Sequence, residues 1–192
     1  MINILYTIIF IILIFVFLYL NKNNIIYIES NLGTKFIIYK DNNKNEKANL
    51  IAQIVANMYI LRDYLYDNIN NYPDFKESII QLKNNFNKNR TSVYETDPNI
   101  DLTSYSVNKG EELSICLQDK NTKELYDINL LMYVIVHEMS HFACSEIGHG
   151  DLFQKIFNKF LLVAMEINLY KKIDFVNNPV NYCGLILNSS II

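Results

Sequence analysis

The chain has 192 residues, of which 51% are hydrophobic, and its formal net charge at pH 7 is -3. That length supports one compact domain with a buried core and a short appendage, and it excludes two full domains. This mildly acidic net charge provides no positive electrostatic field that could bind a phosphate backbone. We therefore expect no direct nucleic-acid binding, and we interpret the Lys and Arg between residues 83 and 90 as a solvated loop face.

The first element expected along the chain is a membrane anchor. Residues 4–20 read ILYTIIFIILIFVFLYL, a run without charge that is just long enough to span a bilayer as a helix. No Lys or Arg precedes the run, as a cleaved signal peptide would require, so we expect an uncleaved anchor over residues 1–22. A buried core helix is the alternative, but a helix that is apolar on every face has no obvious partner to cover it.

The domain over residues 23–192 is expected on the cytoplasmic side of that membrane. Lys22 follows the apolar run, and the positive-inside rule places the positive end in the cytoplasm. Three cysteines, Cys116, Cys144 and Cys183, are an odd number at wide spacing, which matches neither a disulfide framework nor a zinc ribbon. The prediction is a single-pass membrane protein whose domain faces a reducing compartment, with Cys144 as a small buried helix residue.

The next elements are a hairpin and a long helix. Residues 25–29 and 35–39 are β-branched and aromatic, and the segment between them contains a glycine, which predicts a β-hairpin. Apolar residues between positions 50 and 65 recur at helical spacing and predict a helix of about four turns. Residues 71–99 are rich in Asn, Asp and Lys, which predicts loops with one irregular helix around residues 78–86.

A second hairpin is expected just before the histidines of the chain. Residues 103–107 and 112–117 flank a turn cluster of Asn, Lys and Gly. The second of these strands is expected to offer its main chain to an extended peptide. Asp127 is a good N-cap for the following helix, which is expected to run to about Ser145.

The last helix and the tail follow a glycine. Gly148 is expected to stop the preceding helix, and Asp151 to cap the next one, with Gln154 at the spacing of a capping box. The tail from Asn177 is expected to add an edge strand or to lie against the surface. Among these elements, the helix over residues 50–65 is expected to pack on the first hairpin.

Residues 137–141 read HEMSH and match the HExxH pattern inside an apolar helix. Residues four apart share a helical face, so His137 and His141 can reach one metal ion, while Glu138 sits about 100° round the helix. A catalytic zinc ion takes three protein ligands and keeps a fourth position for water. His149, the remaining histidine, supplies the third ligand. The sequence predicts one Zn²⁺ per chain, held by these histidines, with Glu138 as the catalytic general base.

Several alternatives to a zinc peptidase stay open. The histidines could be core residues and Glu138 a surface charge, although all three histidines fall within thirteen residues. The same site could be non-catalytic and stabilise a membrane or virion structural protein. The cluster also fits hydrolysis of a non-peptide amide, and imidazoles accept Co, Ni or Mn as well as Zn. Peptide-bond hydrolysis at a membrane is the leading prediction.

Two tyrosines and two acidic residues near the motif have weaker interpretations. An oxyanion formed during hydrolysis needs a further hydrogen-bond donor, and Tyr105 and Tyr182 are candidates because they lie in the expected strand and tail near the site. We interpret Glu146 as a surface charge at the helix end, and Asp151 as a cap, so that neither is a metal ligand.

The segments around the motif resemble a known family. HEMSH followed by GHGDLFQKIF is similar to the WLM and SprT-like zinc metallopeptidases over roughly residues 100–170. The runs TSYSVNKGEELSICL, LMYVIVHEMSHFA and PVNYCG further resemble uncharacterised WLM-like proteins of large DNA viruses. The resemblance implies a zincin-like α+β fold, zinc held by His137, His141 and His149, and catalysis by Glu138 on a protein or peptide substrate. Cellular members act on proteins crosslinked to DNA, a pattern from which the anchor and the acidic balance of this chain depart.

Overall fold

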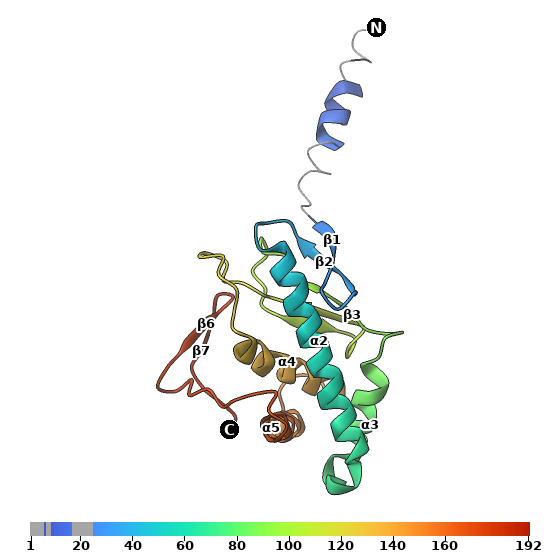
Figure 1. The fold of residues 1–192 in the computed structure, drawn as a ribbon, viewed down its shortest axis with the longest axis vertical. Helices are drawn as coiled ribbons and strands as arrows, with labels where there is room; N and C mark the ends of the chain where they lie inside the picture. Colours follow the sequence, from blue (N-terminus) through green and yellow to red (C-terminus); the bar gives the residue numbers. More distant parts are fainter. Residues whose placement is uncertain (1–5, 7–8, 17–24) are drawn as a thin grey trace.

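The structure, a computed structural model, describes residue 6, residues 9–16 and residues 25–192 (Figure 1). Residues 9–16 are helical, and their apolar side chains are exposed. The rest of the predicted anchor over residues 1–22 lies outside the described residues. Within the described ranges, no helix is both long and apolar enough to cross a membrane.

A five-stranded mixed sheet forms one layer of the fold, with strand order β1-β2-β3-β5-β4. Its strands are β1 (Ile25–Glu29), β2 (Lys35–Tyr39), β3 (Ser92–Glu95), β4 (Tyr105–Val107) and β5 (Glu112–Ile115). The pairs β1–β2 and β4–β5 are antiparallel, which confirms both predicted hairpins.

Strand β3 was not predicted, because it lies in the Asn-rich stretch whose composition indicates loops. It pairs in parallel with β2 on one side and with β5 on the other, and so joins the two hairpins into one sheet. As a result β5 is an internal strand and β4 lies at the edge. The expectation that residues 112–117 offer a free edge to a peptide is therefore wrong, and β4 holds that position.

Four helices cover the sheet and one another (Figure 1). They are α2 (Lys44–Asp67), α3 (Lys76–Asn85), α4 (Ile128–Ala143) and α5 (Asp151–Glu166), with short 3₁₀ turns η1 (Ile69–Asn71) and η2 (Pro73–Phe75) between α2 and α3. Helix α2 contacts β1 and β2, whereas α4 contacts α2, α3, α5 and β4. The predicted helices are thus confirmed, and α4 is the element around which the others gather.

Helix α4 begins where the sequence indicated and is apolar on nearly every face. The Asp127 side chain accepts a hydrogen bond of 2.8 Å from the backbone N–H of Asn129, which caps the helix. Leu131, Ile135 and Phe142 are fully buried. Full burial of one such side chain contributes about 1.5–3 kcal/mol to folding, so this helix is a well-anchored platform.

The ends of α4 and α5 differ from the expectation. Helix α4 stops at Ala143, and Gly148 lies in the following loop with a φ of +85°, where a side chain would be strained. Gly150 holds the N-cap position of α5, so Asp151 lies in the first turn and caps nothing. A carboxylate in the first turn still complements the positive end of the helix dipole.

The tail forms a separate hairpin of β6 (Val180–Tyr182) and β7 (Leu185–Leu187) instead of extending the main sheet. A disulfide between Cys116 and Cys183 ties this hairpin to the chain just after β5. The prediction of free thiols is wrong for these two residues, because the fold brings together cysteines that are 67 positions apart. Cys144 is free and buried, as expected. Since disulfides persist in oxidising environments, the predicted reducing compartment loses its support from the cysteines.

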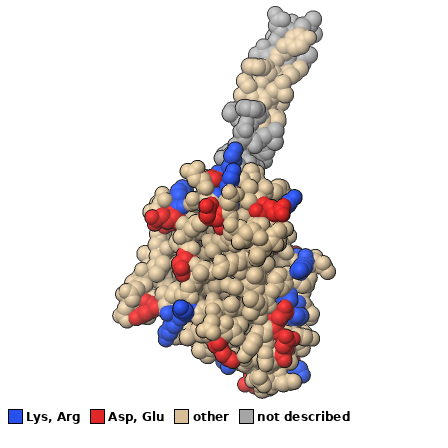
Figure 2. All heavy atoms as spheres, in the orientation of Figure 1, with Lys and Arg blue, Asp and Glu red and all other residues tan. Residues whose placement is uncertain are grey.

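Charged side chains of both signs are interspersed on the face shown in Figure 2, without a continuous basic patch. Within the segment that sequence analysis assigned to a solvated loop face, Lys83 pairs with Asp63 at 2.5 Å. Its charge is therefore already balanced by a neighbouring acid.

Candidate metal centre

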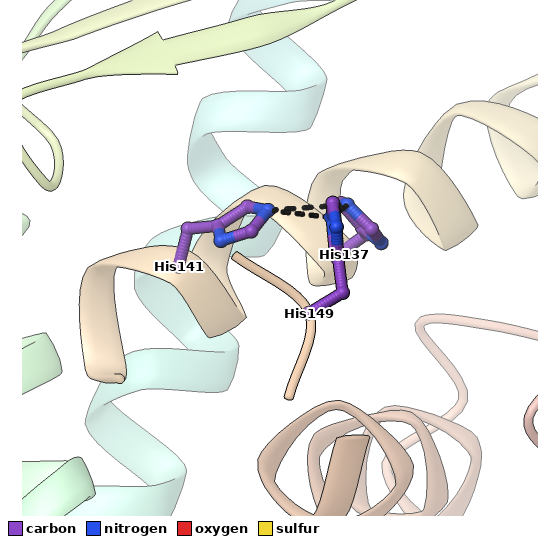
Figure 3. A group of neighbouring side chains, drawn as sticks. All are labelled: His137, His141 and His149. Atoms are coloured by element: carbon purple, nitrogen blue, oxygen red, sulfur yellow. Dashed lines mark hydrogen bonds between the residues drawn. The ribbon is translucent and has the colours of Figure 1, made fainter. Parts of the chain in front are cut away.

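The structure brings all three histidines of the chain to one point (Figure 3). His137 and His141 lie one turn apart on α4, and His149 reaches them from the loop between α4 and α5. Their Nε2 atoms form a triangle with edges of 3.0, 3.1 and 3.2 Å. His137 and His141 are half-buried, whereas His149 is exposed. The predicted set of residues is thus gathered in one place.

This triangle fits a metal ion better than it fits hydrogen bonds among the rings. A nitrogen of a neutral imidazole is either a donor or an acceptor. Of three mutually adjacent Nε2 atoms, at least two must therefore have the same role and repel each other. Tetrahedral zinc with bonds of 2.0–2.1 Å places neighbouring nitrogens about 3.3 Å apart, close to the edges observed. The three residues could therefore hold a metal ion.

The same environment keeps two of the rings neutral. Burial, with the neighbouring His141 and His149, lowers the pKa of His137 to about 3. Burial, with His149 and Lys109 nearby, lowers the pKa of His141 to about 4. Neutral imidazoles present lone pairs, which is the form that binds metals. At neutral pH these two rings are therefore ready to act as ligands.

Aromatic rings of α5 fix the orientation of the histidines. Phe153 stacks on His141, with ring centroids 4.3 Å apart, and meets His137 and His149 edge-on at 4.9 and 4.8 Å. Phe157 meets His137 edge-on at 5.2 Å. Phe153 and Phe157 belong to the buried apolar stripe of α5. The structure shows that this stripe also supports the histidine cluster.

Glu138 lies beside the cluster, and its side chain is buried against β4. Its Oε2 accepts a hydrogen bond of 2.7 Å from the Ser106 hydroxyl. Burial raises the pKa of Glu138 to about 7, even though the Ser106 hydrogen bond acts in the opposite direction. A carboxyl group with a pKa near 7 can both accept and donate a proton near neutral pH. This is the property that a general acid–base needs.

A cleft of about 550 Å³ opens over the cluster. Its walls come from β4 and the turn after it, the outer face of α4, the loop before His149 and the β6–β7 hairpin. The apolar part of the wall includes Tyr105, Val134, Leu185 and Leu187. The histidines and Glu138 are thus accessible to a ligand of peptide size.

The turn after β4 packs on α4 through Gly110 and holds the loop that carries His149 through Lys109. The Lys109 ammonium donates to the backbone carbonyls of Cys144 and Glu146, the latter at 2.8 Å. Gly110 packs so closely that an added Cβ would come within 3.1 Å of the Phe142 ring of α4. The role of Lys109 was not predictable from local sequence, because its partners are carbonyls 35 and 37 positions away.

The weaker candidates from the sequence are placed as follows. The Tyr182 hydroxyl is buried between Ser104 and the carbonyl of Cys116, and this burial raises its pKa, so it is engaged in the fold. Tyr105 lines the cleft. Glu146 is exposed, as expected of a surface charge. Gln154, predicted in a capping box, instead donates to the His149 carbonyl at 3.2 Å.

The fold and the site define an α+β protein with a three-histidine cluster that could hold a metal ion. No protein-family profile matches the chain. Wss1 from Saccharomyces cerevisiae, a WLM metalloprotease, is similar in structure: the match has 17% sequence identity and a TM-score of 0.44, and covers 66% of this chain and 85% of Wss1. A mutant of Wss1 matches with a TM-score of 0.35.

Viral proteins match the sequence more extensively. Uncharacterized protein R325 of Acanthamoeba polyphaga mimivirus is 37% identical over 172 residues, which cover 89% of this chain and 86% of R325. Uncharacterized protein 042R of Invertebrate iridescent virus 3 is 38% identical over 86 residues, which cover 44% of this chain and 52% of that protein. The chain therefore belongs to the family of R325, and the predicted resemblance to proteins of large DNA viruses is confirmed.

Proposed function

We propose that this chain is a zinc-dependent metallopeptidase, with zinc held by His137, His141 and His149 and with Glu138 as the general base. The observation that carries the proposal is the triangle of Nε2 atoms, which lies beside a buried carboxyl group in an open cleft. When bound, zinc supplies Lewis-acid activation of a water molecule and of the substrate carbonyl.

Glu138 performs the proton transfers in this proposal. It takes a proton from the attacking water as the water adds to the carbonyl carbon, and it later delivers a proton to the leaving nitrogen. A pKa of about 7 suits both steps, because the carboxyl group can change protonation state at little cost near neutral pH. The neutral histidines keep their lone pairs for the metal and take no part in proton transfer.

Strand β4 is the element that would receive the substrate. It lies at the edge of the sheet and lines the cleft through Tyr105 and Ser106. An extended peptide that adds beside β4 gains main-chain hydrogen bonds and crosses the cleft next to the histidines. The proposed substrates are therefore unfolded or flexible segments of proteins.

We further propose that residues 1–22 anchor the peptidase domain, residues 23–192, to a membrane. Residues 4–20 carry no charge, and the described part of this run, residues 9–16, is an exposed apolar helix. Recovery of the full-length protein in the detergent-soluble membrane fraction, and its release on deletion of residues 1–22, would support the anchor. Recovery of the intact chain in the aqueous fraction would contradict it.

A non-catalytic zinc site is the alternative, and the cluster argues against it. Structural zinc sites are closed by four protein ligands, whereas catalytic sites keep an open position. Among the described residues, no fourth His, Cys, Asp or Glu joins the three histidines. The cluster also faces a cleft, where a water molecule and a substrate can reach the open position.

The test combines metal content with peptide cleavage by the full-length protein. Elemental analysis should find one zinc per chain, which His137→Ala and His149→Ala should remove. Glu138→Gln should keep the zinc and lose cleavage of an unfolded protein or peptide library, while Glu146→Gln, at an exposed acid beside the cleft, should change neither. Undiminished cleavage by Glu138→Gln would contradict the mechanism. Turnover of simple amides without peptide cleavage would redirect the substrate assignment.

A further inference from the structure

Ser106 occupies a position in β4 where the sheet otherwise buries apolar side chains. It pairs across the ladder with Leu113 of β5, which is fully buried. Directly opposed residues of an antiparallel pair project from the same face of the sheet. Ser106 therefore projects toward the helices and reaches Glu138 on α4. A small hydroxyl side chain at this position leaves room for the carboxyl group and provides a donor for it.

The contact between Ser106 and Glu138 is specific to one carboxylate oxygen. Ser106 donates to Oε2 at 2.7 Å, and no other group of the described residues forms a hydrogen bond with the Glu138 side chain. Oε1 is thus left without a protein partner among those residues. A glutamate side chain has three rotatable bonds, so burial alone does not determine which way its carboxyl group faces.

We propose that Ser106 is a positioning residue of the hydrolytic site, which holds Oε2 of Glu138 so that Oε1 faces the reacting water. This inference rests on the proposed function, because it assigns a partner to the proposed general base. The Ser106 hydroxyl touches neither the substrate nor the metal ligands in this role, and acts through Glu138. Groups that orient the residues of a metal site commonly change activity or metal affinity about 10- to 100-fold when they are removed.

The position of Ser106 also links the base to the substrate strand. Ser106 is the middle residue of β4, and β4 provides the free edge beside the cleft. The element that would pair with a bound peptide is therefore the same element that orients Glu138. This arrangement fixes the base relative to the scissile bond through one short strand, without relying on the loop that carries His149.

The decisive experiment compares Ser106→Ala, Ser106→Thr and the control Ser92→Ala in the full-length, zinc-loaded protein. Ser92 is an exposed serine in β3 of the same sheet, outside the cleft. Ser106→Ala should lower kcat about 10- to 100-fold with little change in KM and with one zinc per chain retained. Ser106→Thr keeps the hydroxyl in a residue that strands favour and should recover most of kcat. Ser92→Ala should match the parent protein.

A crystal structure of zinc-loaded Ser106→Ala provides a readout that is independent of turnover. The Glu138 carboxyl group should occupy more than one orientation in this variant and a single one in the parent. Unchanged kcat in Ser106→Ala, with a single ordered orientation of Glu138, would overturn the proposal. It would also be overturned if Ser106→Thr lost as much activity and as much zinc as Ser106→Ala. If the parent binds zinc but cleaves nothing, the proposed function fails, while the orientation of Glu138 still decides the role of Ser106.

Discussion

Two clusters of buried ionisable groups lie in this domain, and they differ in how their charges are balanced. At the start of α2, Lys47 is fully buried and pairs with Asp41 at 2.5 Å and with Glu95 at 2.6 Å. On α4, Glu138 is almost equally buried, but its hydrogen-bond partner among the described residues is the neutral hydroxyl of Ser106. The first cluster pairs a cation with two anions, whereas the second leaves a carboxyl group without a cation.

The protonation of the carboxyl groups reflects this difference. Burial pushes the pKa of Asp41 upward, but hydrogen bonds from Lys47 and Gln118 outweigh burial and the net pKa is lowered. Burial raises the pKa of Glu95, and the hydrogen bond with Lys47 offsets part of that rise. Burial raises the pKa of Glu138 to about 7, with only Ser106 acting against it.

A structural cluster and a candidate functional cluster differ in whether the protein itself balances their charges. A buried charge that the protein itself pairs needs no ligand, and the Lys47 cluster joins the helical layer to the sheet. An unpaired carboxyl group beside three histidines whose nitrogens repel one another is unfavourable in the protein alone, and a cation bound there would relieve it. Perturbed groups of this second kind concentrate at functional sites.

The largest effect on stability is expected when the cation of the Lys47 cluster is removed. Lys47→Ala leaves the buried Glu95 and the partly buried Asp41 without their cation, and we expect it to destabilise the fold by about 3–5 kcal/mol. Urea denaturation at pH 7 measures this loss. Lys44→Ala, one turn earlier on the same helix and in no ion pair of the described residues, is the control and should change stability by less than about 1 kcal/mol. Equal effects of the two variants would show that the Lys47 ion pairs are unimportant.

The second effect has the opposite sign. The folded-state pKa of Glu138 is raised from 4.5 to about 7, so the penalty for its ionisation is absent below pH 4.5 and complete above pH 7. Glu138→Gln should therefore stabilise the metal-free protein at pH 8 by about 3 kcal/mol, from 1.36 kcal/mol per pKa unit, and should have little effect at pH 4. Denaturation at both pH values measures the difference. No gain in stability at pH 8 would mean that burial does not disfavour the ionised form of Glu138.

A third prediction concerns Lys109, whose ammonium group reaches the backbone near the histidines. Lys109→Met removes the donor to the carbonyls of Cys144 and Glu146 and so loosens the loop that carries His149. We expect zinc affinity to fall about tenfold, with little change in stability. Competition with a zinc chelator measures this affinity. Lys44→Ala, which should keep both the fold and the loop, should leave zinc affinity unchanged, so equal affinity in the two variants would contradict the role of Lys109.

The smallest expected effect tests whether Tyr182 stabilises the fold or takes part in catalysis. Tyr182→Phe removes the hydrogen bonds to Ser104 and to the Cys116 carbonyl, which should destabilise the fold by about 1 kcal/mol. Because that hydroxyl is engaged in the fold, kcat should not change. A large loss of kcat with normal stability would restore Tyr182 as an oxyanion donor. Thermal denaturation and peptide cleavage on the same sample separate the two outcomes.

Local sequence determined the platform of the site. The apolar run after Asp127 forms α4, because helical periodicity and an N-cap are both properties of neighbouring residues. The same periodicity places His137 and His141 one turn apart on one face. The two hairpins of the sheet follow from strand and turn residues that lie within a few positions of one another.

Tertiary structure decided what surrounds that platform. Strand β3 pairs with β2 and β5 in spite of its Asn-rich neighbourhood. Its backbone N–H and C=O groups find partners on both sides only in the assembled sheet. Three contacts join residues that lie 32 to 67 positions apart. They are the disulfide between Cys116 and Cys183, the hydrogen bond from Ser106 to Glu138, and the hydrogen bond from Lys109 to the loop after α4. The sequence alone thus determined which residues could form a metal site, because their pattern lies within one helix and the loop after it. Their burial, their hydrogen-bond partners and the cleft in front of them depend on contacts between distant segments, which only folding creates.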